Sequence, residues 1–319
     1  MSETTIWTPW ATAAEAEHVL GSRPGVAYVP FLDPAELPDD PAQATMVVLP
    51  YAQNPAPIFD RIDEFSQLRL IQAQMAGTDN INDRVPEGVT LCNAAGVHDA
   101  ATAELALALT LASNRTLDQY ARDQTQGQWQ PHWAPGLAYQ RVLIFGYGRI
   151  GKAIERRLRG FEPASITRVA TSARTEDLDG EPVQVQAADQ LGDLLGETDI
   201  AIIIAPLTDA TRGLFDANLL ARLPHGALLV NMGRGPSVDT DALIEACQSG
   251  RLRAALDVID PEPVPADHRL RTTPGVFFSP HVGGLTDAFA PRRDHLLRQQ
   301  VERFLAGDEL DNVVIAAHR

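Results

Sequence analysis

The chain has 319 residues, of which 26 are Lys or Arg and 42 are Asp or Glu, so its formal net charge at pH 7 is -16. That excess of negative charge would repel nucleic-acid phosphates and anionic membranes, and no basic block interrupts it, so neither partner is expected. With 45% hydrophobic and 21% charged residues, the composition is that of a globular protein long enough for two packed domains.

Short apolar runs alternate with Pro and Asp clusters along the N-terminal part of the chain. These runs are TIWTP, VAYVP, TMVVLPY, LRLIQAQ and VTLCNAAG. Each has the length of a strand and is followed by a polar, helix-compatible segment, which is the rhythm of a parallel sheet covered by helices. We therefore predict a small α/β unit here.

A segment without Gly or Pro follows, over about 99–126. Its Ala and Leu content and its broad apolar face predict one long helix. A loop comes next, and it contains Trp129, Pro131, Trp133 and Pro135.

A second α/β series begins after this loop. Its predicted strands are RVLIFGYG, ITRVATS, DIAIIIAP, ALLVNMG, AALDVI and VFFSPH, separated by helical stretches or short turns. Six strands in this rhythm predict a doubly wound parallel sheet. A further helix is predicted over about 287–305, before the acidic, weakly apolar tail DELDNVVIAAHR.

The sequence gives no sign of a secreted protein or of a metalloprotein. Its first residues, MSETTIWTPW, lack the layout of a signal peptide, and the longest apolar runs are strand-sized, so we expect a cytoplasmic protein. Cys92 and Cys247 lie far apart in the chain and are interpreted as small buried hydrophobic residues. The eight histidines show no HxxxH spacing and the cysteines no CxxC, so no metal is expected.

The stretch LIFGYGRIG breaks an apolar run with Gly146, Gly148 and Gly151. Gly146 permits the tight turn out of the strand, Gly148 lets the backbone approach a pyrophosphate, and Gly151 lets helix and strand pack closely. The pyrophosphate would sit at the start of the helix RIGKAIERRLRGF. Because the glycines follow a predicted strand and open a predicted helix, we predict a dinucleotide site in place of a merely structural turn.

The end of the next predicted strand bears on which dinucleotide binds. An NAD-binding protein places an Asp or Glu about 20 residues after the glycines, where it holds the ribose. This chain reads RVATSART there and offers Thr171, Ser172 and Arg174. Hydroxyl groups and a guanidinium suit the 2′-phosphate of NADP, so we expect NADP(H) to be preferred and NAD(H) to be possible. Two alternatives stay open: Arg174 as a solvated loop charge, and Glu176 or Asp177 as the group that reaches the ribose.

Polar side chains follow three of the later predicted strands. Arg234 in VNMGRGPSVD, Asp257 and Glu262 in ALDVIDPEP, and His281 in FFSPHVGG each come after an apolar run and near Gly or Pro. Since ligands of a doubly wound sheet bind at the carboxyl ends of its strands, we expect these loops at one edge. Taken singly, Arg234 could be a loop salt bridge, Glu262 a turn charge and His281 a hydrogen-bonded surface residue.

Together, an Arg, a carboxylate and an imidazole beside a nicotinamide suit the reduction of a 2-oxo acid. The Arg would bind the substrate carboxylate at two points and polarise the neighbouring carbonyl. The His would donate a proton to the forming alkoxide. The Glu would orient the imidazole and keep it more readily protonated.

Further motifs extend over most of the chain. They are AGTDNIN at 76–82, NAAGVHDAATAELALAL at 93–109, GYGRIG, APLTDATRGLF at 205–215, NMGRGPSVDTDALIEA, ALDVIDPEP and SPHVGG. A chain with these motifs resembles the D-isomer-specific 2-hydroxyacid dehydrogenase family, which includes glyoxylate/hydroxypyruvate reductases and phosphoglycerate dehydrogenases. The motifs are jointly very specific, although the glycine loop alone would not be.

With the predicted elements, this resemblance implies an α/β fold of two doubly wound, Rossmann-like parallel-sheet domains. Residues 1–96 and 288–319 would form a discontinuous substrate-binding domain, and residues 97–287 the dinucleotide-binding domain. Members of the family are usually dimers built around the nucleotide domain, so we expect a homodimer in which the helix at 99–126 is a candidate interface.

The resemblance also implies roles for individual residues. Arg234 would bind substrate, Glu262 would orient the acid/base, and His281 would be the acid/base and contact the substrate. Ala76 and Gly77 would offer backbone N–H groups to the substrate carboxylate.

The implied cofactor contacts extend over both ends of the dinucleotide. They are Arg149 and Ile150 over the pyrophosphate, Ala205, Pro206 and Thr211 along the adenosine side, Asp257 and the backbone near Met232 and Gly233 at the nicotinamide end, and Gly283 and Gly284 of SPHVGG.

Comparison with the family's other activities narrows the expected reaction. Formate dehydrogenases of this family carry Gln where this chain has Glu262, and phosphite dehydrogenases use a Lys in the stretch that here reads QMAGTDN. We therefore expect an NAD(P)-dependent D-2-hydroxyacid dehydrogenase that acts on a small 2-oxo or 2-hydroxy acid, of the glyoxylate/hydroxypyruvate reductase type. The alternatives are a catalytically weak nucleotide-sensing or corepressor-like protein on the same scaffold, and an enzyme with an unusual acceptor. The substrate's side chain and the physiological direction stay open.

Overall fold

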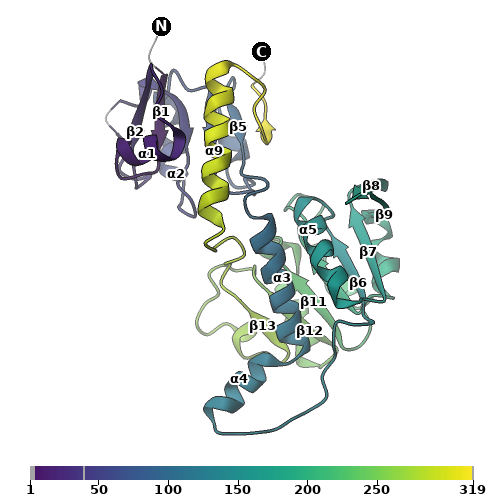
Figure 1. Ribbon diagram of the computed structural model, residues 1–319. Coiled ribbons are helices and arrows are strands. Elements are labelled where there is room, and N and C mark those ends of the chain that lie inside the picture. Colours follow the sequence, from purple (N-terminus) through teal and green to yellow (C-terminus); the bar gives the residue numbers. More distant parts are fainter. Residues whose placement is uncertain (1–3, 39, 318–319) are drawn as a thin grey trace. The chain divides into compact units, whose positions relative to one another are not determined.

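The computed structural model describes residues 4–38 and 40–317, and these divide into two compact units. Unit 1 contains the described residues up to His98 and from Asp287 onwards, and unit 2 is Asp99–Thr286. Each is an α/β unit with its own sheet (Figure 1). The predicted boundaries, after residues 96 and 287, differ from these by at most two residues. The binding roles assigned to the two domains remain predictions.

The strands of unit 1 largely follow the predicted apolar runs. They are β1 (Thr4–Thr8), β2 (Val26–Pro30), β3 (Ala44–Val48), β4 (Leu70–Gln72), β5 (Thr90–Cys92) and β14 (Val313–Ile315). Within the described residues of this unit they form a six-stranded sheet in the order β14-β5-β4-β3-β1-β2. The first five are parallel, as predicted, whereas β14 pairs antiparallel with β5 and was not predicted from the weakly apolar tail.

Helices cover both faces of the unit 1 sheet. They are α1 (Ala13–Leu20), α2 (Ala56–Asp60) and α9 (Phe289–Ala306). Leu20 of α1 and Leu297 of α9 share one hydrophobic core, while Phe59 of α2 belongs to the other. The helix predicted over 287–305 is confirmed as α9, which ends at Gly307 in the left-handed conformation usual for a helix C-terminus.

The strands of unit 2 include all six that the second series of apolar runs predicts. The strands are β6 (Arg141–Phe145), β7 (Ser165–Ala170), β8 (Arg174–Leu178), β9 (Glu181–Ala187), β10 (Ile200–Ile203), β11 (Ala227–Asn231), β12 (Leu252–Leu256) and β13 (Val276–Phe278). Within the described part of unit 2 they form an eight-stranded sheet in the order β13-β12-β11-β10-β6-β7-β9-β8. All neighbours are parallel except the β8–β9 hairpin.

The β8–β9 hairpin was not predicted. Asp179 and Gly180 form its turn, both with positive φ (58° and 87°), and an Asp-Gly pair is a strong hairpin signal. Its strands are largely polar, because they lie at the edge of the sheet and bury few side chains.

The order of six of these strands defines a doubly wound sheet. Across the sheet these strands lie in the order β9, β7, β6, β10, β11 and β12, which is the arrangement 3-2-1-4-5-6 when the six are numbered along the chain. The direction of winding reverses between β6 and β10, and ligands bind in the crevice that such a reversal opens at the carboxyl ends of the strands. The glycine loop follows β6 directly, so it lies at this crevice.

Five helices of the described part of unit 2 pack on the faces of its sheet: α3 (Asp99–Asn114), α5 (Arg149–Leu158), α6 (Leu191–Leu195), α7 (Ala217–Leu220) and α8 (Thr240–Gln248). A sixth, α4 (Leu117–Thr125), contacts α3 and contributes no side chain to either core. One core contains side chains of α3 and α5, and the other contains side chains of α6, α7 and α8. Figure 1 shows α3 and α5 close together beside the sheet.

The prediction of one long helix over 99–126 is wrong, because the structure divides it into α3 and α4. Thr116 takes the left-handed conformation, with φ of 51°, between the two helices. The side chain of the buried Asn114 donates to the carbonyl of Gly136 at 3.1 Å. Asn and Thr favour helix less than the Ala and Leu before them, and the partly buried contact with Gly136 ties the end of α3 to the later loop.

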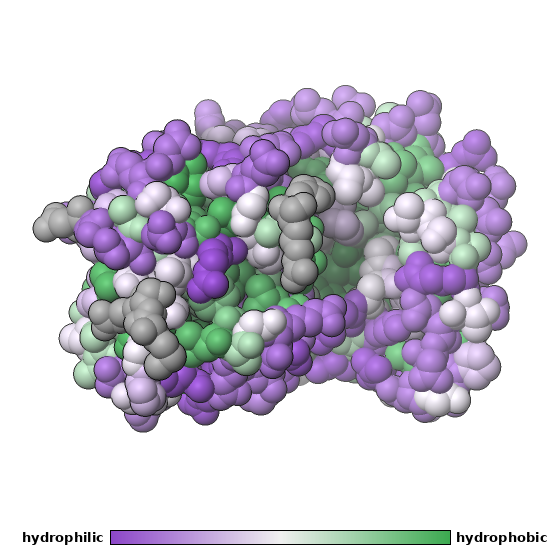
Figure 2. Space-filling model, turned by 90° about the horizontal axis from the view of Figure 1, so that it is seen from above, coloured by the Kyte–Doolittle hydropathy of each residue, from purple (hydrophilic) through white to green (hydrophobic). Residues whose placement is uncertain are grey.

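The fold class predicted from the sequence is confirmed: the protein is α/β, with two sheets in which parallel pairs dominate. Cys92 and Cys247 are buried and free, as their interpretation as small hydrophobic residues requires. No helix in the described part of the chain is long and apolar enough to cross a membrane. Figure 2 shows hydrophilic residues over much of the visible face, with hydrophobic residues between them.

Candidate active site

Gly146 and Gly148 lie in the turn between β6 and α5, and Gly151 lies in the first turn of α5. Gly146 has φ of 103°, and a Cβ there would lie 2.4 Å from the nitrogen of Ala205. A Cβ on Gly151 would lie 2.7 Å from the carbonyl oxygen of Gly146. Gly148 is different, because no atom of the described chain outside its immediate neighbours lies within 4 Å of its Cβ position. Protein packing does not require glycine there, and the open space at the N-terminus of α5 fits a dinucleotide pyrophosphate.

The next two predicted cofactor residues begin α5. Arg149 donates from Nε to Asp99 Oδ2 at 3.0 Å, and Ile150 packs against the core shared with α3. Asp99, the first residue of α3, was not singled out from the sequence. Its pairing with Arg149 ties the start of α3 to the start of α5 beside the glycine turn.

The loop after β10 lies on the other side of the winding reversal. Ala205 and Pro206 follow this strand after Ile204, and the backbone of Ala205 lies against Gly146 of the glycine turn. The Thr211 hydroxyl donates to the carbonyl of Pro206 at 2.7 Å and accepts from the Thr208 N–H at 2.8 Å. In the structure Thr211 therefore shapes this loop.

The predicted phosphate-binding residues lie between β7 and β8. Thr171 and Ser172 are exposed in the turn, and Arg174 begins β8. The Arg174 guanidinium donates to the carbonyl oxygens of Tyr147, in the glycine turn, at 3.0 Å and of Ser172 at 3.3 Å, and to the Glu176 carboxylate at 2.6 Å. The Arg174 side chain is thus held by three contacts, and it is 36% exposed.

Glu176, one alternative ribose ligand from the sequence, is engaged elsewhere. One carboxylate oxygen accepts from Arg174 Nε, and the other accepts from Lys152 Nζ at 2.6 Å. Sequence reasoning missed Lys152, because its direction from α5 towards β8 depends on a hairpin that was not predicted.

The loops that carry Arg234, Asp257, Glu262 and His281 open at one edge of the sheet, as predicted. They follow β11, β12 and β13, which are neighbouring parallel strands. Since parallel strands end at the same edge, their following loops are brought together.

Glu262 and His281 form a hydrogen-bonded pair. Glu262 Oε1 lies 2.8 Å from His281 Nδ1, and the two side chains are 40% and 50% exposed. Because an ionised carboxylate only accepts, Nδ1 carries a proton, and Nε2 is left to exchange one with a substrate. His281 has a φ of 53°, a conformation that costs about 1–3 kcal/mol, and its N–H donates to the Asp257 carbonyl at 2.9 Å. The backbone thus fixes where the imidazole lies.

The charges around His281 act in opposite directions. The hydrogen bond to Glu262 raises the pKa of His281 above its ordinary value, and the negative charges of Glu262 and Asp257 add to this. Burial and the positive charge of Arg234 lower the pKa but do not cancel the rise. The imidazole is therefore more readily protonated than a free one, which suits a proton donor.

Replacing Glu262 by Gln is expected to lower the pKa of His281, because the largest cause of its rise is removed. Carbonyl reduction requires a protonated His281. With a lower pKa of His281, the rate of the variant should therefore begin to fall at a lower pH than the rate of the unchanged protein. The pH dependence of kcat/KM for carbonyl reduction measures this shift. An unchanged pH profile would contradict the role of Glu262.

Arg234 lies close enough to affect the His281 charge, and its backbone is held in place. The Asn231 side chain donates to the Arg234 carbonyl at 3.0 Å and accepts from the Gly233 N–H at 3.1 Å. The Arg234 guanidinium donates to the Gly233 carbonyl at 2.9 Å. Asn231, the last residue of β11, was not predicted as a site residue, although its position just before MGRG is the available signal. Met232 is buried beside this turn.

Asp257 is 3% exposed and organises the loop that carries His281. Its carboxylate accepts from the Ser279 hydroxyl at 2.6 Å and from the N–H groups of Val282 at 2.9 Å and Gly283 at 2.8 Å. A Cβ on Gly283 would lie 2.9 Å from Asp257 Oδ2, so glycine allows this close approach. Gly284 follows in the same loop. Besides its predicted nicotinamide contact, Asp257 therefore has a clear role in holding the His281 loop.

Ala76 and Gly77, the remaining predicted substrate residues, belong to unit 1, whereas the other candidates belong to unit 2. The Asn93 side chain donates to the Ala76 carbonyl at 2.7 Å, and the Ala94 N–H donates to the Met75 carbonyl at 2.9 Å. The loop after β4 is thus fixed by the loop after β5. Asn93 was not singled out from the sequence.

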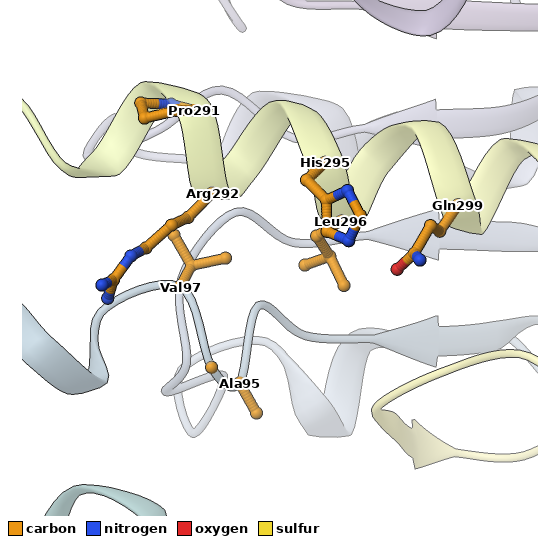
Figure 3. A pocket seen from close by; sticks show the side chains of 8 residues that line it. Ala95, Val97, Pro291, Arg292, His295, Leu296 and Gln299 are labelled. Atoms are coloured by element: carbon orange, nitrogen blue, oxygen red, sulfur yellow. The ribbon is translucent and has the colours of Figure 1, made fainter. Parts of the chain in front are cut away.

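Unit 1 also contains a pocket of about 570 Å³ between α9 and the loop after β5. Figure 3 shows that His295 and Leu296 of α9 point towards the loop that carries Ala95 and Val97. None of the predicted site residues lines it, so we do not assign the catalytic site to this pocket. Over residues 4–38 and 40–317, no group of three or more His, Cys, Asp or Glu side chains could hold a metal ion.

Known proteins are similar to this chain in both sequence and fold. Residues 107–283, more than half of the chain, match the family profile described as "D-isomer specific 2-hydroxyacid dehydrogenase, NAD binding domain". Glyoxylate/hydroxypyruvate reductase B from Escherichia fergusonii is 33% identical over 234 residues, which cover 70% of this chain and 71% of the relative.

Two solved structures are similar over nearly the whole chain. NADPH-dependent glyoxylate/hydroxypyruvate reductase from Sinorhizobium meliloti, in complex with NADP and sulfate, has a TM-score of 0.80 at 26% identity and covers 98% of each chain. NAD-dependent formate dehydrogenase from Staphylococcus aureus, in complex with NAD, has a TM-score of 0.75 at 25% identity and covers 99% of each chain.

Proposed function

The chain belongs to the D-isomer specific 2-hydroxyacid dehydrogenase family, and from this premise we propose that it reduces a small 2-oxo acid to the D-2-hydroxy acid with NADPH. The resemblance seen in the sequence motifs is confirmed, and the protein is an NAD(P)-dependent 2-hydroxyacid oxidoreductase. Among substrates, we propose 2-oxo acids of the glyoxylate and hydroxypyruvate type, on which the relatives from E. fergusonii and S. meliloti act by name.

The observation that carries this proposal is the Glu262–His281 pair with Arg234 beside it. When bound, the dinucleotide supplies the hydride that reduces the keto carbon. Arg234 holds the substrate carboxylate and polarises the carbonyl, because its planar guanidinium offers two parallel N–H groups. His281 gives its Nε2 proton to the carbonyl oxygen, and Glu262 stabilises the imidazolium before transfer. Ala76 and Gly77 add backbone donors for the carboxylate.

The residues that hold the dinucleotide belong to the loops at the winding reversal. We assign the pyrophosphate to the glycine turn with Arg149 and Ile150, the adenosine side to the loop of Ala205, Pro206 and Thr211, and the nicotinamide end to Met232, Gly233, Asp257, Gly283 and Gly284. The open space at Gly148 supports the first of these assignments.

NADP(H) is proposed as the preferred cofactor and NAD(H) as a possible one. Arg174 lies against the glycine turn with Ser172 beside it, and Thr171 precedes them in the same exposed turn. Two cations hold the Glu176 carboxylate, which argues against Glu176 as a ribose ligand in an NAD-type site. The 2′-phosphate would meet the guanidinium and the hydroxyls at this turn.

The alternative of a catalytically weak sensing or corepressor-like protein is not favoured. The dinucleotide loop is expected in a sensing protein and in an enzyme alike, so it does not distinguish them. A sensor requires neither a proton donor nor a carboxylate that raises the donor's pKa, and both are present here.

We also propose a cytoplasmic homodimer. The segment after α4 exposes Trp129 and Trp133 almost completely, at 93% and 102%, and large aromatic side chains are enriched in interfaces. In place of the undivided helix first considered, α3, α4 and this segment are the proposed contact region.

A panel of 2-oxo acids, assayed with NADPH and with NADH, tests the proposed function. Glyoxylate and hydroxypyruvate are expected to be reduced with a higher kcat/KM for NADPH than for NADH, and pyruvate is the comparison with a methyl side chain. The rate of nucleotide oxidation at 340 nm measures each pair. No turnover with any 2-oxo acid, together with normal nucleotide binding, would support the sensing alternative.

A further inference from the structure

Three charged side chains form a cluster beside the glycine turn. The Glu176 carboxylate lies between Lys152 Nζ and Arg174 Nε, at 2.6 Å from each. Arg174 and Glu176 are two residues apart on β8, so they point to the same face of the strand. Lys152 reaches this face from the first turn of α5. Lys152 and Glu176 are only 25% and 23% exposed, so their charges are partly shielded from water.

The cluster borders the region proposed for the adenosine ribose. The Arg174 guanidinium also donates to the Tyr147 carbonyl in the glycine turn. The cluster therefore connects the edge hairpin, the start of α5 and the turn that follows β6. All of these elements belong to unit 2.

The cluster carries one net positive charge. Lys152 and Arg174 are cations, and Glu176 is an anion. Hydrogen bonds from Lys152, and then from Arg174, hold the pKa of Glu176 below its ordinary value, so its carboxylate stays ionised at neutral pH. Without Lys152, the remaining Arg174–Glu176 pair would be neutral overall, and the carboxylate would repel a nearby phosphate.

We propose that Lys152 is a specificity-determining residue for NADP(H): it neutralises Glu176 and so leaves the Arg174 guanidinium available to the 2′-phosphate. Lys152 acts through the other two residues and is thus a positioning residue. This inference rests on the preference for NADP(H) proposed above. The absence of an Asp or Glu after β7 indicates NADP(H) but does not identify Lys152 or the charge balance of the cluster.

Binding of two nucleotides that differ only in the 2′-phosphate tests the inference without turnover. Adenosine 2′,5′-bisphosphate and adenosine 5′-monophosphate are titrated into the protein by calorimetry, and the ratio of their Kd values is compared. Lys152→Met is expected to weaken binding of the bisphosphate about tenfold, the effect of one charge at short range in a partly hydrated site. Binding of the monophosphate should not change, which also shows that the site is folded.

A second substitution separates charge balance from a structural role. Adding Glu176→Gln to Lys152→Met removes the uncompensated carboxylate and returns the cluster to one net positive charge. The double variant is therefore expected to regain most of the wild-type ratio. Loss of a structural contact between α5 and the hairpin would not be repaired by a change that also removes the second partner.

Arg156 offers a matched control. It lies one helical turn after Lys152 on α5 and pairs with Asp179 of the same hairpin at 2.8 Å. Arg156→Met removes the same charge and the same kind of link but leaves Glu176 and Arg174 untouched, so the Kd ratio should not change. Arg174→Ala removes the proposed phosphate ligand and should abolish the preference.

The possible results separate the two claims. If the wild-type protein binds both nucleotides equally, the proposed NADP(H) preference fails, and the inference fails with it. If the wild-type protein prefers the bisphosphate and Lys152→Met keeps that preference, only the role of Lys152 is wrong. A double variant as weak as Lys152→Met alone would also overturn the inference, because neutralising Glu176 would then not be what Lys152 does.

Discussion

Replacing His281 by alanine is expected to lower kcat for 2-oxo acid reduction by about 10²- to 10⁴-fold, the range that a general acid contributes. The proton for the carbonyl oxygen would then have to come from water, without the Glu262 hydrogen bond that raises the pKa of His281. The loss should appear in kcat with glyoxylate and with hydroxypyruvate. Nucleotide binding should change little, because the glycine turn and the Arg174 cluster are not altered.

His225 provides the control for the His281 substitution. It is an exposed histidine of the same unit, placed between α7 and β11, and its replacement by alanine should leave kcat near the wild-type value. Near-normal rates for the His281 variant with several 2-oxo acids would show that another group donates the proton. A variant that no longer binds adenosine 5′-monophosphate would instead indicate a folding defect, and His281→Gln would then replace it.

Local sequence patterns predicted the strands and the loop positions well. The apolar runs from Arg141 to Phe145 and from Ala227 to Asn231 become buried strands, since parallel strands covered on both faces are continuously apolar. The same reasoning placed the loops of Arg234, Glu262 and His281 at one edge, because consecutive parallel strands end on the same side. Proximity of functional groups therefore followed from chain order and strand direction alone.

Elements stabilised mainly by tertiary contacts were missed. No residue of β14 is buried, and this strand forms by pairing with β5. The hairpin β8–β9 is largely polar because it lies at the sheet edge. The break at Thr116 depends on the Asn114 contact with Gly136, which lies far along the chain. Hydrophobic periodicity contains none of this information.

In the candidate site, too, the residue types could be predicted from the sequence, but the contacts that depend on the folded loops could not. The His281–Glu262 pair was expected from the combination of residue types, but its 2.8 Å contact and the left-handed backbone of His281 were not. Ser279, which acts through the Asp257 carboxylate, carries no sequence signal of its own, and the only signal for Asn231 is its position just before MGRG. Their roles depend on which way side chains point after the loops have folded, and the same holds for Lys152.

Replacing Arg234 by alanine is expected to lower kcat/KM for 2-oxo acids by about two to four orders of magnitude. A charge-assisted hydrogen bond is worth roughly 1.5–3 kcal/mol, and a guanidinium makes two to one carboxylate. Arg234→Lys keeps the charge but loses the fork, so its kcat/KM should lie between those of the alanine variant and the unchanged protein. Arg222→Ala, which removes an exposed arginine of the same unit, is the control and should have little effect.

The Arg234 variants also make a prediction that loss of a substrate contact alone does not. The positive charge of Arg234 lowers the pKa of His281, so Arg234→Ala should raise that pKa, whereas Arg234→Lys should leave it nearly unchanged. Glu262→Gln should lower it, because the main cause of its rise is then absent. Titration of the His281 ring by NMR measures these shifts without turnover. Shifts of opposite sign for Arg234→Ala and Glu262→Gln would mean that both groups act on one imidazole; shifts of the same sign would contradict the arrangement of the three residues as a single catalytic site.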